Sequence, residues 1–307
     1  MGSAEARRGD FGGFAMTRRR GLSRRIAALG ACESGKPARR VYAIKPGGMQ
    51  TMAQREEAGP SSVDPEDVAR FDRIGEDWWS ADGPMAALHK LNPVRVAYLR
   101  DLMSRHFRVE GLPRDRYAPR PLEGLRILDA GCGAGLLAEP LARLGARVTA
   151  IDPAPRNIEV ARRHAEKSGL SIDYRMTTIE ALSGEAATFD AVLAMEVLEH
   201  VLDVAGFVRC CGALVRPGGL MFAATLNRTL KSFAFAIVGA EYVLGWAPRG
   251  THDWRRFISP RELARAMAAA DLSAFDETGV VFDPLQGGWR LAHDTDINYM
   301  MAASKRR

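Results

Sequence analysis

Three glycines and an aspartate in one stretch of the sequence have the types and spacing of a nucleoside-binding turn. Asp129 ends an apolar run that reads as a buried strand, and Gly131, Gly133 and Gly135 follow it at alternate positions. Glycines let a nucleoside and a charged amino-acid tail lie directly against the backbone. A dinucleotide fingerprint has Gly or Ala at its sixth position, where this chain has Leu136. The spacing is instead typical of S-adenosylmethionine sites, and an acidic strand end suits a ligand with sulfonium and ammonium groups.

A second carboxylate ends the β-rich run at 147–152, about 20 residues further on, which is the length after which a βαβ unit returns beside its first strand. This residue is Asp152. We expect its carboxylate to accept hydrogen bonds from both hydroxyls of a ribose. The alternative is a Rossmann-like turn that binds no ligand, in which Asp152 only caps the next helix.

The elements around these residues predict an α/β fold with a mostly parallel sheet. The runs expected as strands are 127–130, 147–152, 172–176, 189–195 and 220–225, and the expected helices are 136–144, 155–168 and 204–215. The run at 189–195 is apolar, as a central parallel strand must be. Open parallel sheets bind ligands beyond the carboxyl ends of their strands, so Met195 to His200 should lie over the site.

Two helices are expected before the first strand. Asp64 followed by Pro65 marks a helix start. Apolar residues then recur at helical spacing at Val68, Phe71, Ile74, Trp78 and Trp79. In the second helix, at 91–107, Arg95 could bind a ligand carboxylate bidentately, although a solvated arginine on the helix face is the alternative. We therefore predict an N-terminal helical cover at 63–118 and the main domain at 119–307.

Residues 1–62 are rich in Arg, Gly and Ala without an apolar period, which predicts a disordered basic tail. Residues 1–51 hold eleven basic and three acidic residues, so the net charge of +6 comes from this tail. The rest of the chain therefore gives no support to nucleic-acid binding. The tail has three explanations: an organelle transit peptide, a lipid-binding segment, or upstream codons before a true start at Met52. The acidic, ordinary composition after Met52 favours the third.

The cysteines and the hydropathy give two further expectations. Cys32, Cys132, Cys210 and Cys211 lack the spacing of a metal site or a disulfide framework, which fits a reducing cytoplasm. No unbroken apolar run reaches about 18 residues, so no transmembrane helix is expected.

A set of short motifs runs in order through residues 64–304. The motifs are Trp78-Trp79, Leu88 to Arg95, Met195 to His200, Thr225 to Arg228, Lys231-Ser232, Val238 to Tyr242, Gly250 to Asp253 and Asp296 to Met300. With these motifs the chain resembles a class I S-adenosylmethionine-dependent methyltransferase, and more narrowly the ubiquinone-biosynthesis O-methyltransferases of bacteria and mitochondria. The departures are Ser80, where an acidic residue is usual, and Ala134, where a glycine is common.

The resemblance implies a Rossmann-like sheet of seven strands, six parallel and one reversed, with helices on both faces. It also implies an N-terminal helical cover and an insertion after strand five, with the last strands at 280–285 and 298–304. It places the contacts with S-adenosylmethionine on Arg95, Gly131, Asp152 and Met195. The implied reaction methylates a catechol-type hydroxyl on a polyprenylated aromatic ring, as in the two O-methylations of ubiquinone biosynthesis. The alternatives are methylation of another phenol or of a ring carbon, and a protein that binds the cofactor without catalysis.

Glu196, Glu199 and His200 are the candidates for activating that hydroxyl. A phenol, with a pKa near 10, reacts poorly until its proton is removed or its oxyanion is stabilised. The three residues would share one face if a helix begins at Glu196. The resemblance to mitochondrial members favours all three as ligands of Mg²⁺ or a similar ion. The alternatives are His200 as direct proton acceptor and a metal-free turn that only closes the pocket.

The insertion, at about 228–258, contains an apolar, aromatic-rich stretch at 233–246. Its basic flanks are Arg228, Lys231, Arg249, Arg255 and Arg256. Such a composition is typical of a membrane-interface segment, and the alternative is a helical lid on the protein itself. A polyprenyl substrate lies in the bilayer, so we expect peripheral binding to an anionic membrane. The expected location is the cytoplasmic face of the inner membrane, or the matrix face in mitochondria, with other ubiquinone-biosynthesis enzymes as candidate partners.

Overall fold

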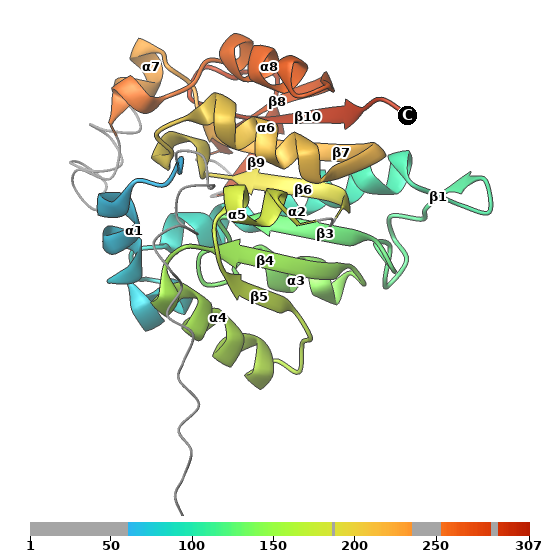
Figure 1. The fold of residues 1–307 in the computed structure, drawn as a ribbon, viewed down its shortest axis with the longest axis horizontal. Helices are drawn as coiled ribbons and strands as arrows, with labels where there is room; N and C mark the ends of the chain where they lie inside the picture. The colour runs from blue at the N-terminus through green and yellow to red at the C-terminus, as the bar shows by residue number, and fades with distance from the viewer. Residues whose placement is uncertain (1–60, 186–187, 235–252, 284–287) are drawn as a thin grey trace, which may run out of the picture. The chain divides into compact units, whose positions relative to one another are not determined.

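The computed structural model describes residues 61–185, 188–234, 253–283 and 288–307. Its main sheet has eight strands in the order β5-β4-β3-β6-β7-β10-β8-β9, with helices on both faces (Figure 1). These strands are β3 (Arg126–Ala130), β4 (Arg147–Asp152), β5 (Asp173–Met176), β6 (Phe189–Met195), β7 (Val215–Leu226), β8 (Leu272–Asp283), β9 (Gly288–Ala292) and β10 (Asn298–Lys305). A separate hairpin pairs β1 (Arg108–Val109) with β2 (Leu112–Pro113).

Buried side chains divide the longer helices between the two faces of the sheet. One face carries α2 (Ala86–His106), α3 (Ala138–Arg143) and α4 (Pro155–Lys167), and the other carries α5 (Ile179–Ser183), α6 (Val204–Leu214) and α8 (Pro260–Ala269). The shorter elements are α1 (Pro65–Asp72), α7 (Leu230–Ser232) and the 3-10 turns η2 (Gly75–Trp79), η3 (Leu198–His200) and η5 (Trp254–Arg256). Both faces are covered, as a mostly parallel sheet requires.

The strand count differs from the seven expected. Six strands are parallel, but β10 and β9 both run in reverse, because β10 pairs antiparallel with β7 and β8, and β9 pairs antiparallel with β8. The strand expected at 280–285 is the end of the longer β8. The extra edge strand β9 packs Trp289 against Phe282, with ring centroids 5.6 Å apart. The five-residue β9 is too short to show a clear alternation in the sequence.

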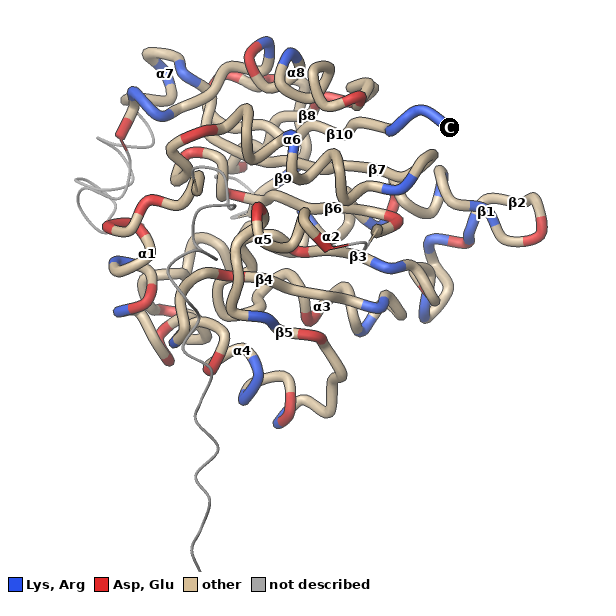
Figure 2. The backbone as a smooth tube through the Cα atoms, in the orientation of Figure 1, with Lys and Arg blue, Asp and Glu red and all other residues tan. Residues whose placement is uncertain are grey.

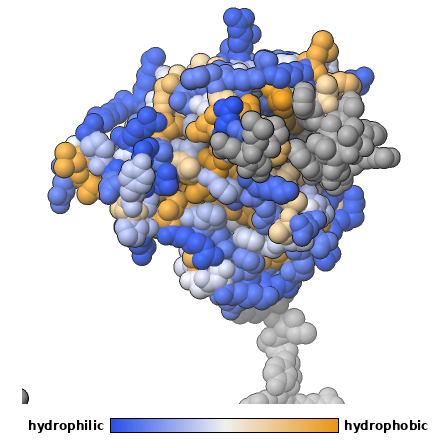
Figure 3. All heavy atoms as spheres, turned by 180° about the vertical axis from the view of Figure 1, so that it is seen from behind, coloured by the Kyte–Doolittle hydropathy of each residue, from blue (hydrophilic) through white to orange (hydrophobic). Residues whose placement is uncertain are grey.

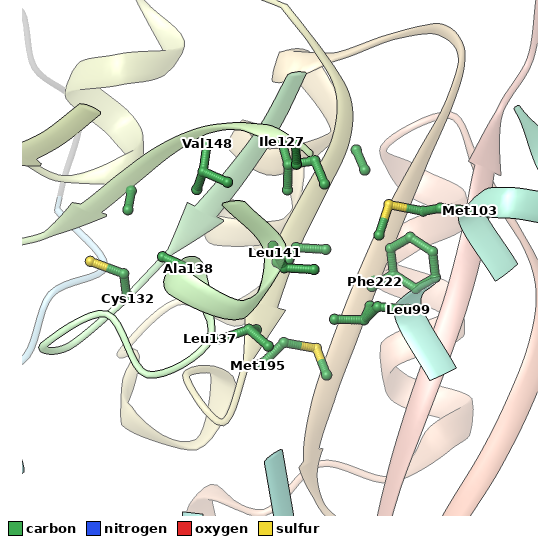
Figure 4. Close-up of a cluster of buried hydrophobic side chains, with 14 of the residues drawn as sticks. Leu99, Met103, Ile127, Cys132, Leu137, Ala138, Leu141, Val148, Met195 and Phe222 are labelled. Atoms are coloured by element: carbon green, nitrogen blue, oxygen red, sulfur yellow. The ribbon is translucent and has the colours of Figure 1, made fainter. Parts of the chain in front are cut away.

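Alternate residues of each central strand enter different cores. Ile127 lies in the cluster shared with α2 and α3, whereas Leu128 lies in the cluster shared with α6 and α8. Figure 4 shows the first cluster, in which Leu99 and Met103 of α2 lie near Phe222 of β7. Charged residues lie mainly on helices and loops, and the central strands carry few (Figure 2). The apolar runs of the sequence are therefore the strands of the sheet interior.

The predicted N-terminal cover has two parts with different roles. Asp64 caps α1 by accepting the backbone N–H of Glu66 (3.0 Å), as its position before Pro65 predicted. Trp79 Nε1 donates to the carbonyl of Ala134 (3.1 Å), which fastens η2 to the glycine-rich turn. By contrast, α2 belongs to the main core. The predicted tail at 1–62 lies almost entirely outside the described residues.

Two expectations from composition can be compared with the described part of the chain. Cys132, Cys210 and Cys211 are free thiols there. In the same residues no helix is long and apolar enough to cross a membrane.

Candidate cofactor and catalytic site

A pocket opens beyond the carboxyl ends of β3, β4 and β6, where the sequence predicted the site. It encloses about 770 Å³ of empty space, including the part open to solvent. Five of the predicted site residues line it, namely Gly131, Gly133, Asp152, Glu196 and His200. The other five, Arg95, Asp129, Gly135, Met195 and Glu199, are not on its wall. Side chains of the N-terminal cover, among them Phe71 and Trp78, form part of the wall.

The glycine-rich turn is fixed by backbone geometry and by close neighbours. Gly131 and Gly133 have φ of +76° and +52°, which favour glycine. A Cβ on Gly131 would lie 2.5 Å from Val197, and one on Gly133 would lie 2.5 Å from the Trp78 ring. The backbone conformation and these neighbours therefore favour glycine at both positions, and both residues lie on the pocket wall.

Gly135 has a different role, because its α-carbon faces Tyr174. A Cβ there would overlap the Tyr174 hydroxyl, and φ is +88°. We expect Gly135→Ala to lower the free energy of unfolding by about 2–4 kcal/mol, through overpacking and backbone strain. Urea unfolding measures the loss.

Gly124 provides a matched control for this substitution. Its φ is +75°, but a Cβ would meet nothing within 4 Å, so Gly124→Ala should cost only the backbone strain, about 1–2 kcal/mol. Adding Tyr174→Phe to Gly135→Ala should restore part of the loss. Equal destabilisation by the two alanine variants would contradict the packing role of Tyr174.

Asp152 ends β4 and is already engaged by protein donors. Its Oδ2 accepts the backbone N–H of Gly133 (2.9 Å), and its Oδ1 accepts the backbone N–H of Ala154 (2.9 Å) and Asn157 Nδ2 (3.2 Å). Burial raises its pKa above the usual range despite these hydrogen bonds. A carboxylate offers about four acceptor positions, so little room remains for the two ribose hydroxyls predicted to bind here.

Asp129, at the end of β3, is a buried carboxylate whose charge is poorly compensated. Its Oδ2 has no hydrogen-bond partner among the described residues. Burial first, and then the nearby Asp152, raise its pKa to about 7, while Arg95 lowers it. Such a group is stabilised by any cation that reaches it.

Arg95 and Met195 lie next to the pocket rather than on its wall. The buried Arg95 extends from α2, and its Nη2 lies 2.7 Å from Glu196 Oε1. Met195, the last residue of β6, belongs to the hydrophobic cluster of Figure 4. Neither side chain lies on the pocket wall, and within the described residues Arg95 Nη2 makes no hydrogen bond despite its closeness to Glu196.

Glu199 is buried away from the pocket. Its Oε2 accepts a hydrogen bond from Thr225 Oγ1 (2.7 Å). Burial, and then the charge of Glu196, raise its pKa above the usual range. The side chain therefore connects η3 to the end of β7.

His200 lines the pocket and is held by α1. Its Nδ1 lies 3.1 Å from Asp67 Oδ2 and 3.5 Å from Arg70 Nη2, and its ring meets Phe71 edge-on. Burial raises the pKa of Asp67, but the hydrogen bond and charge of His200 and the charge of Arg70 outweigh burial and lower it overall. Among the described residues, Nε2 has no hydrogen-bond partner, so it is available to a ligand.

The comparisons with known proteins identify the family of the chain. A sequence model of a methyltransferase domain matches residues 104–276. A ubiquinone biosynthesis O-methyltransferase of Methylobacterium sp. is 58% identical over 247 residues, which cover 80% of this chain and 97% of that protein. One from Parvibaculum lavamentivorans is 53% identical over 257 residues, covering 83% of this chain and 100% of that protein.

The chain belongs to the ubiquinone biosynthesis O-methyltransferase family. Among solved structures, magnesium protoporphyrin IX methyltransferase from Synechocystis PCC 6803 with bound S-adenosylmethionine has a TM-score of 0.51 at 14% identity. The match covers 80% of this chain and 100% of that one. Likeness at this identity concerns the fold alone, and it is the class I methyltransferase fold that the motifs predicted.

The cation site that the family resemblance predicted does not fit the observed geometry. Glu196 has φ of +59°, and only Leu198–His200 forms a helical turn, so the three residues do not share a helix face. Glu196 pairs with Arg95, Glu199 bonds to Thr225 and His200 bonds to Asp67. No group of three His, Cys, Asp or Glu side chains within the described ranges is arranged to hold a metal. In this arrangement the three side chains do not fit one shared cation.

The membrane segment predicted at 233–246 lies outside the described residues, except for Phe233, which is exposed, and Ala234. Three of its basic flanks are paired within the protein: Arg228 with Glu262, Lys231 with Asp294 (2.5 Å) and Arg256 with Asp64 (2.7 Å). On the face shown in Figure 3, apolar side chains are interspersed with hydrophilic ones. The flanks therefore offer less uncompensated charge to lipid than the sequence suggested.

The sequence did not point to two polar residues of the site, Asp67 and Asn157. Asp67 contacts His200 from 133 positions away, and no local pattern indicates that contact. Asn157, five residues after Asp152, is buried and lines the pocket. The sequence shows only an asparagine in the first turn of the helix that follows Asp152, and this position alone does not predict a contact with the pocket.

Proposed function

We propose that the protein transfers a methyl group from S-adenosylmethionine to a catechol-type hydroxyl of a polyprenylated aromatic ring in ubiquinone biosynthesis. The observation that carries this proposal is a single pocket lined both by the glycine turn with Asp152 and by the imidazole of His200. The first group suits a nucleoside and the second can accept a proton. The names of the close relatives support the same reaction.

The residues present fit this cofactor, whose sulfonium supplies the methyl group when it is bound. The backbone of Gly131 and Gly133 allows close approach, and Asp152 has remaining acceptor capacity for the ribose. The unpartnered, buried carboxylate oxygen of Asp129 suits the ammonium of the amino-acid tail. Arg95, which pairs with Glu196, would bind the cofactor's carboxylate, and Met195 would contact the cofactor from the end of β6.

His200 is the proposed acceptor of the phenolic proton. The Asp67 carboxylate, whose pKa is lowered, can only accept, and it lies closer to Nδ1 (3.1 Å) than the donating Arg70 Nη2 does (3.5 Å). We therefore assign the imidazole hydrogen to Nδ1, which leaves Nε2 as an acceptor. Nε2 would take the proton of the substrate hydroxyl while the hydroxyl oxygen forms a bond to the methyl carbon. The bound cofactor would supply the methyl group and would leave as S-adenosylhomocysteine, with the electron pair of the broken carbon–sulfur bond on sulfur, and the product would be a methyl ether.

Turnover of a short-chain catechol with methyl-labelled S-adenosylmethionine tests this function. NMR of the product distinguishes a methyl ether from a methylated ring carbon. The ether supports the proposal, and a ring-carbon product supports the alternative enzyme. Binding of S-adenosylhomocysteine without turnover of any catechol would favour a non-catalytic binding protein.

The resemblance also suggests Mg²⁺ or a similar cation. The three predicted ligands each have a separate partner in the structure, which leads us to expect turnover without a cation. Because His200 can accept the proton without a cation, we expect kcat to remain within about twofold after EDTA treatment and gel filtration. Turnover is assayed with and without added Mg²⁺. A loss that Mg²⁺ restores would contradict this expectation, and would require Glu196, Glu199 and His200 to rearrange into one ligand set.

Peripheral membrane association is proposed from the composition of residues 233–246 and the bilayer location of polyprenyl compounds. We expect the protein to sediment with anionic vesicles, and polar replacement of Phe235, Ile237 and Trp246 to weaken binding by about 2 kcal/mol per side chain. Turnover of a water-soluble catechol should survive this change. Failure of the unmodified protein to sediment with vesicles would favour the internal-lid alternative.

A further inference from the structure

Asn157 is a buried side chain of the pocket wall with an unused acceptor. It lies in the first turn of α4 and is only 1% exposed. Its Oδ1 has no hydrogen-bond partner among the described residues. A buried acceptor without a partner is destabilising, so its retention at a ligand pocket points to a donor that arrives with the ligand.

The orientation of the Asn157 amide follows from its neighbour. Both carboxyl oxygens of Asp152 already accept backbone N–H groups, from Gly133 and Ala154. The amide therefore meets Asp152 with its nitrogen, and Nδ2 donates to Oδ1 over 3.2 Å. This fixes Oδ1 of Asn157 as the atom turned away from Asp152.

The acceptor capacity of Asp152 supports a role for this atom. Three donors occupy three of its roughly four acceptor positions, and the remaining one is on Oδ2. A ribose presents two adjacent hydroxyls, each with a hydrogen to donate. Asp152 can take one of them, and the second needs another acceptor on the same wall.

We propose that Asn157 Oδ1 accepts the hydrogen bond of one ribose hydroxyl of the adenosine ligand, while Asp152 Oδ2 accepts that of the other. This inference rests on the proposed function, because it needs an adenosine-containing ligand in the pocket. It makes Asn157 a ribose-binding residue and also the side chain that holds Asp152 in place.

The experiment combines a residue change with a ligand change. Calorimetry measures the affinity of the full-length protein and of Asn157→Leu for S-adenosylhomocysteine and for its 2′-deoxy and 3′-deoxy analogues. In the unmodified protein, removal of either hydroxyl should weaken binding about tenfold. In Asn157→Leu, removal of one particular hydroxyl should have no further effect, whereas removal of the other should still weaken binding. Such non-additivity identifies a direct contact.

Other outcomes overturn the inference and remain distinguishable from failure of the proposed function. If Asn157 acted only by orienting Asp152, Asn157→Leu and Asp152→Ala would make the same hydroxyl dispensable, whereas two direct contacts require the two variants to make different hydroxyls dispensable. If both deoxy analogues bind the unmodified protein as tightly as S-adenosylhomocysteine does, neither Asn157 Oδ1 nor Asp152 Oδ2 binds a ribose hydroxyl. This measurement does not depend on the folding of any variant. Asn157→Ala provides a second variant if the leucine variant does not fold. Absence of any S-adenosylhomocysteine binding would instead contradict the proposed function itself.

Discussion

Replacing His200 with Ala is expected to lower kcat for a catechol substrate by about 10²- to 10⁴-fold, the usual contribution of a positioned proton acceptor. The expectation follows from the geometry of the imidazole, which lines the pocket and has Nδ1 held by Asp67 at 3.1 Å. Affinity for S-adenosylhomocysteine should stay nearly unchanged, because the variant leaves Gly131 and Asp152 intact. Steady-state kinetics and calorimetry on the same preparations measure the two quantities.

Two further variants separate catalysis from general damage. His106→Ala removes an exposed imidazole on α2 whose Nε2 bonds to the carbonyl of Gly218 (2.9 Å), and its kcat should match that of the unmodified protein. Asp67→Asn removes the charge that fixes the His200 tautomer, and should lower kcat at least about tenfold with little change in KM. Unchanged kcat in His200→Ala would rule out the proposed proton acceptor and leave solvent as the base.

Much of the sheet could be predicted because buried parallel strands are apolar on both faces. The apolar run predicts the strand Phe189–Met195, and the length of a βαβ unit together with β-rich residues predicts Arg147–Asp152. The order of glycines and carboxylates predicts the pocket at the carboxyl ends of these strands. The edge strand Gly288–Ala292 was not predicted, because it is stabilised by pairing with β8 rather than by burial. Local sequence carries information on burial but little on which edge receives a partner.

The candidate catalytic residues show a different limit. The spacing of Glu196, Glu199 and His200 matches a helix face, yet Glu196 adopts a left-handed conformation and each side chain has a separate partner. The residue that orients His200 comes from α1, which the sequence identified only as a cover. Side-chain partners distant in sequence depend on tertiary packing, and no local spacing rule contains them.

Asp129→Asn is expected to change stability and cofactor affinity in opposite directions. Burial and Asp152 raise the pKa of Asp129 to about 7 in the folded protein, whereas the unfolded value is about 3.9. Between these values the folded state keeps a proton that the unfolded state has lost, so this residue makes stability fall as the pH rises from about 4 to about 7. Asn cannot ionise, so the variant should be more stable at pH 8 by up to about 4 kcal/mol, with little difference at pH 4.

Urea unfolding of the ligand-free protein at several pH values measures this effect. Asp173→Asn provides the control, because that carboxylate is 48% exposed at the edge of the sheet, and no comparable gain at pH 8 is expected. A stability profile of Asp129→Asn that parallels that of the unmodified protein would show that the buried carboxylate is compensated by a group other than Arg95.

The same substitution should weaken S-adenosylhomocysteine binding by about 10- to 100-fold, because a charge-assisted hydrogen bond to the ligand's ammonium contributes about 1.5–3 kcal/mol. Pairing with the ammonium favours the ionised carboxylate, so the unmodified protein should release protons on binding at pH 6 to 7. Calorimetry in buffers of different ionisation enthalpy detects this release, and Asp129→Asn should abolish it. If the variant binds as tightly as the unmodified protein and the proton release persists, the ammonium lies elsewhere. Loss of affinity together with gain of stability would mean that the fold tolerates a costly buried carboxylate because its cofactor requires it.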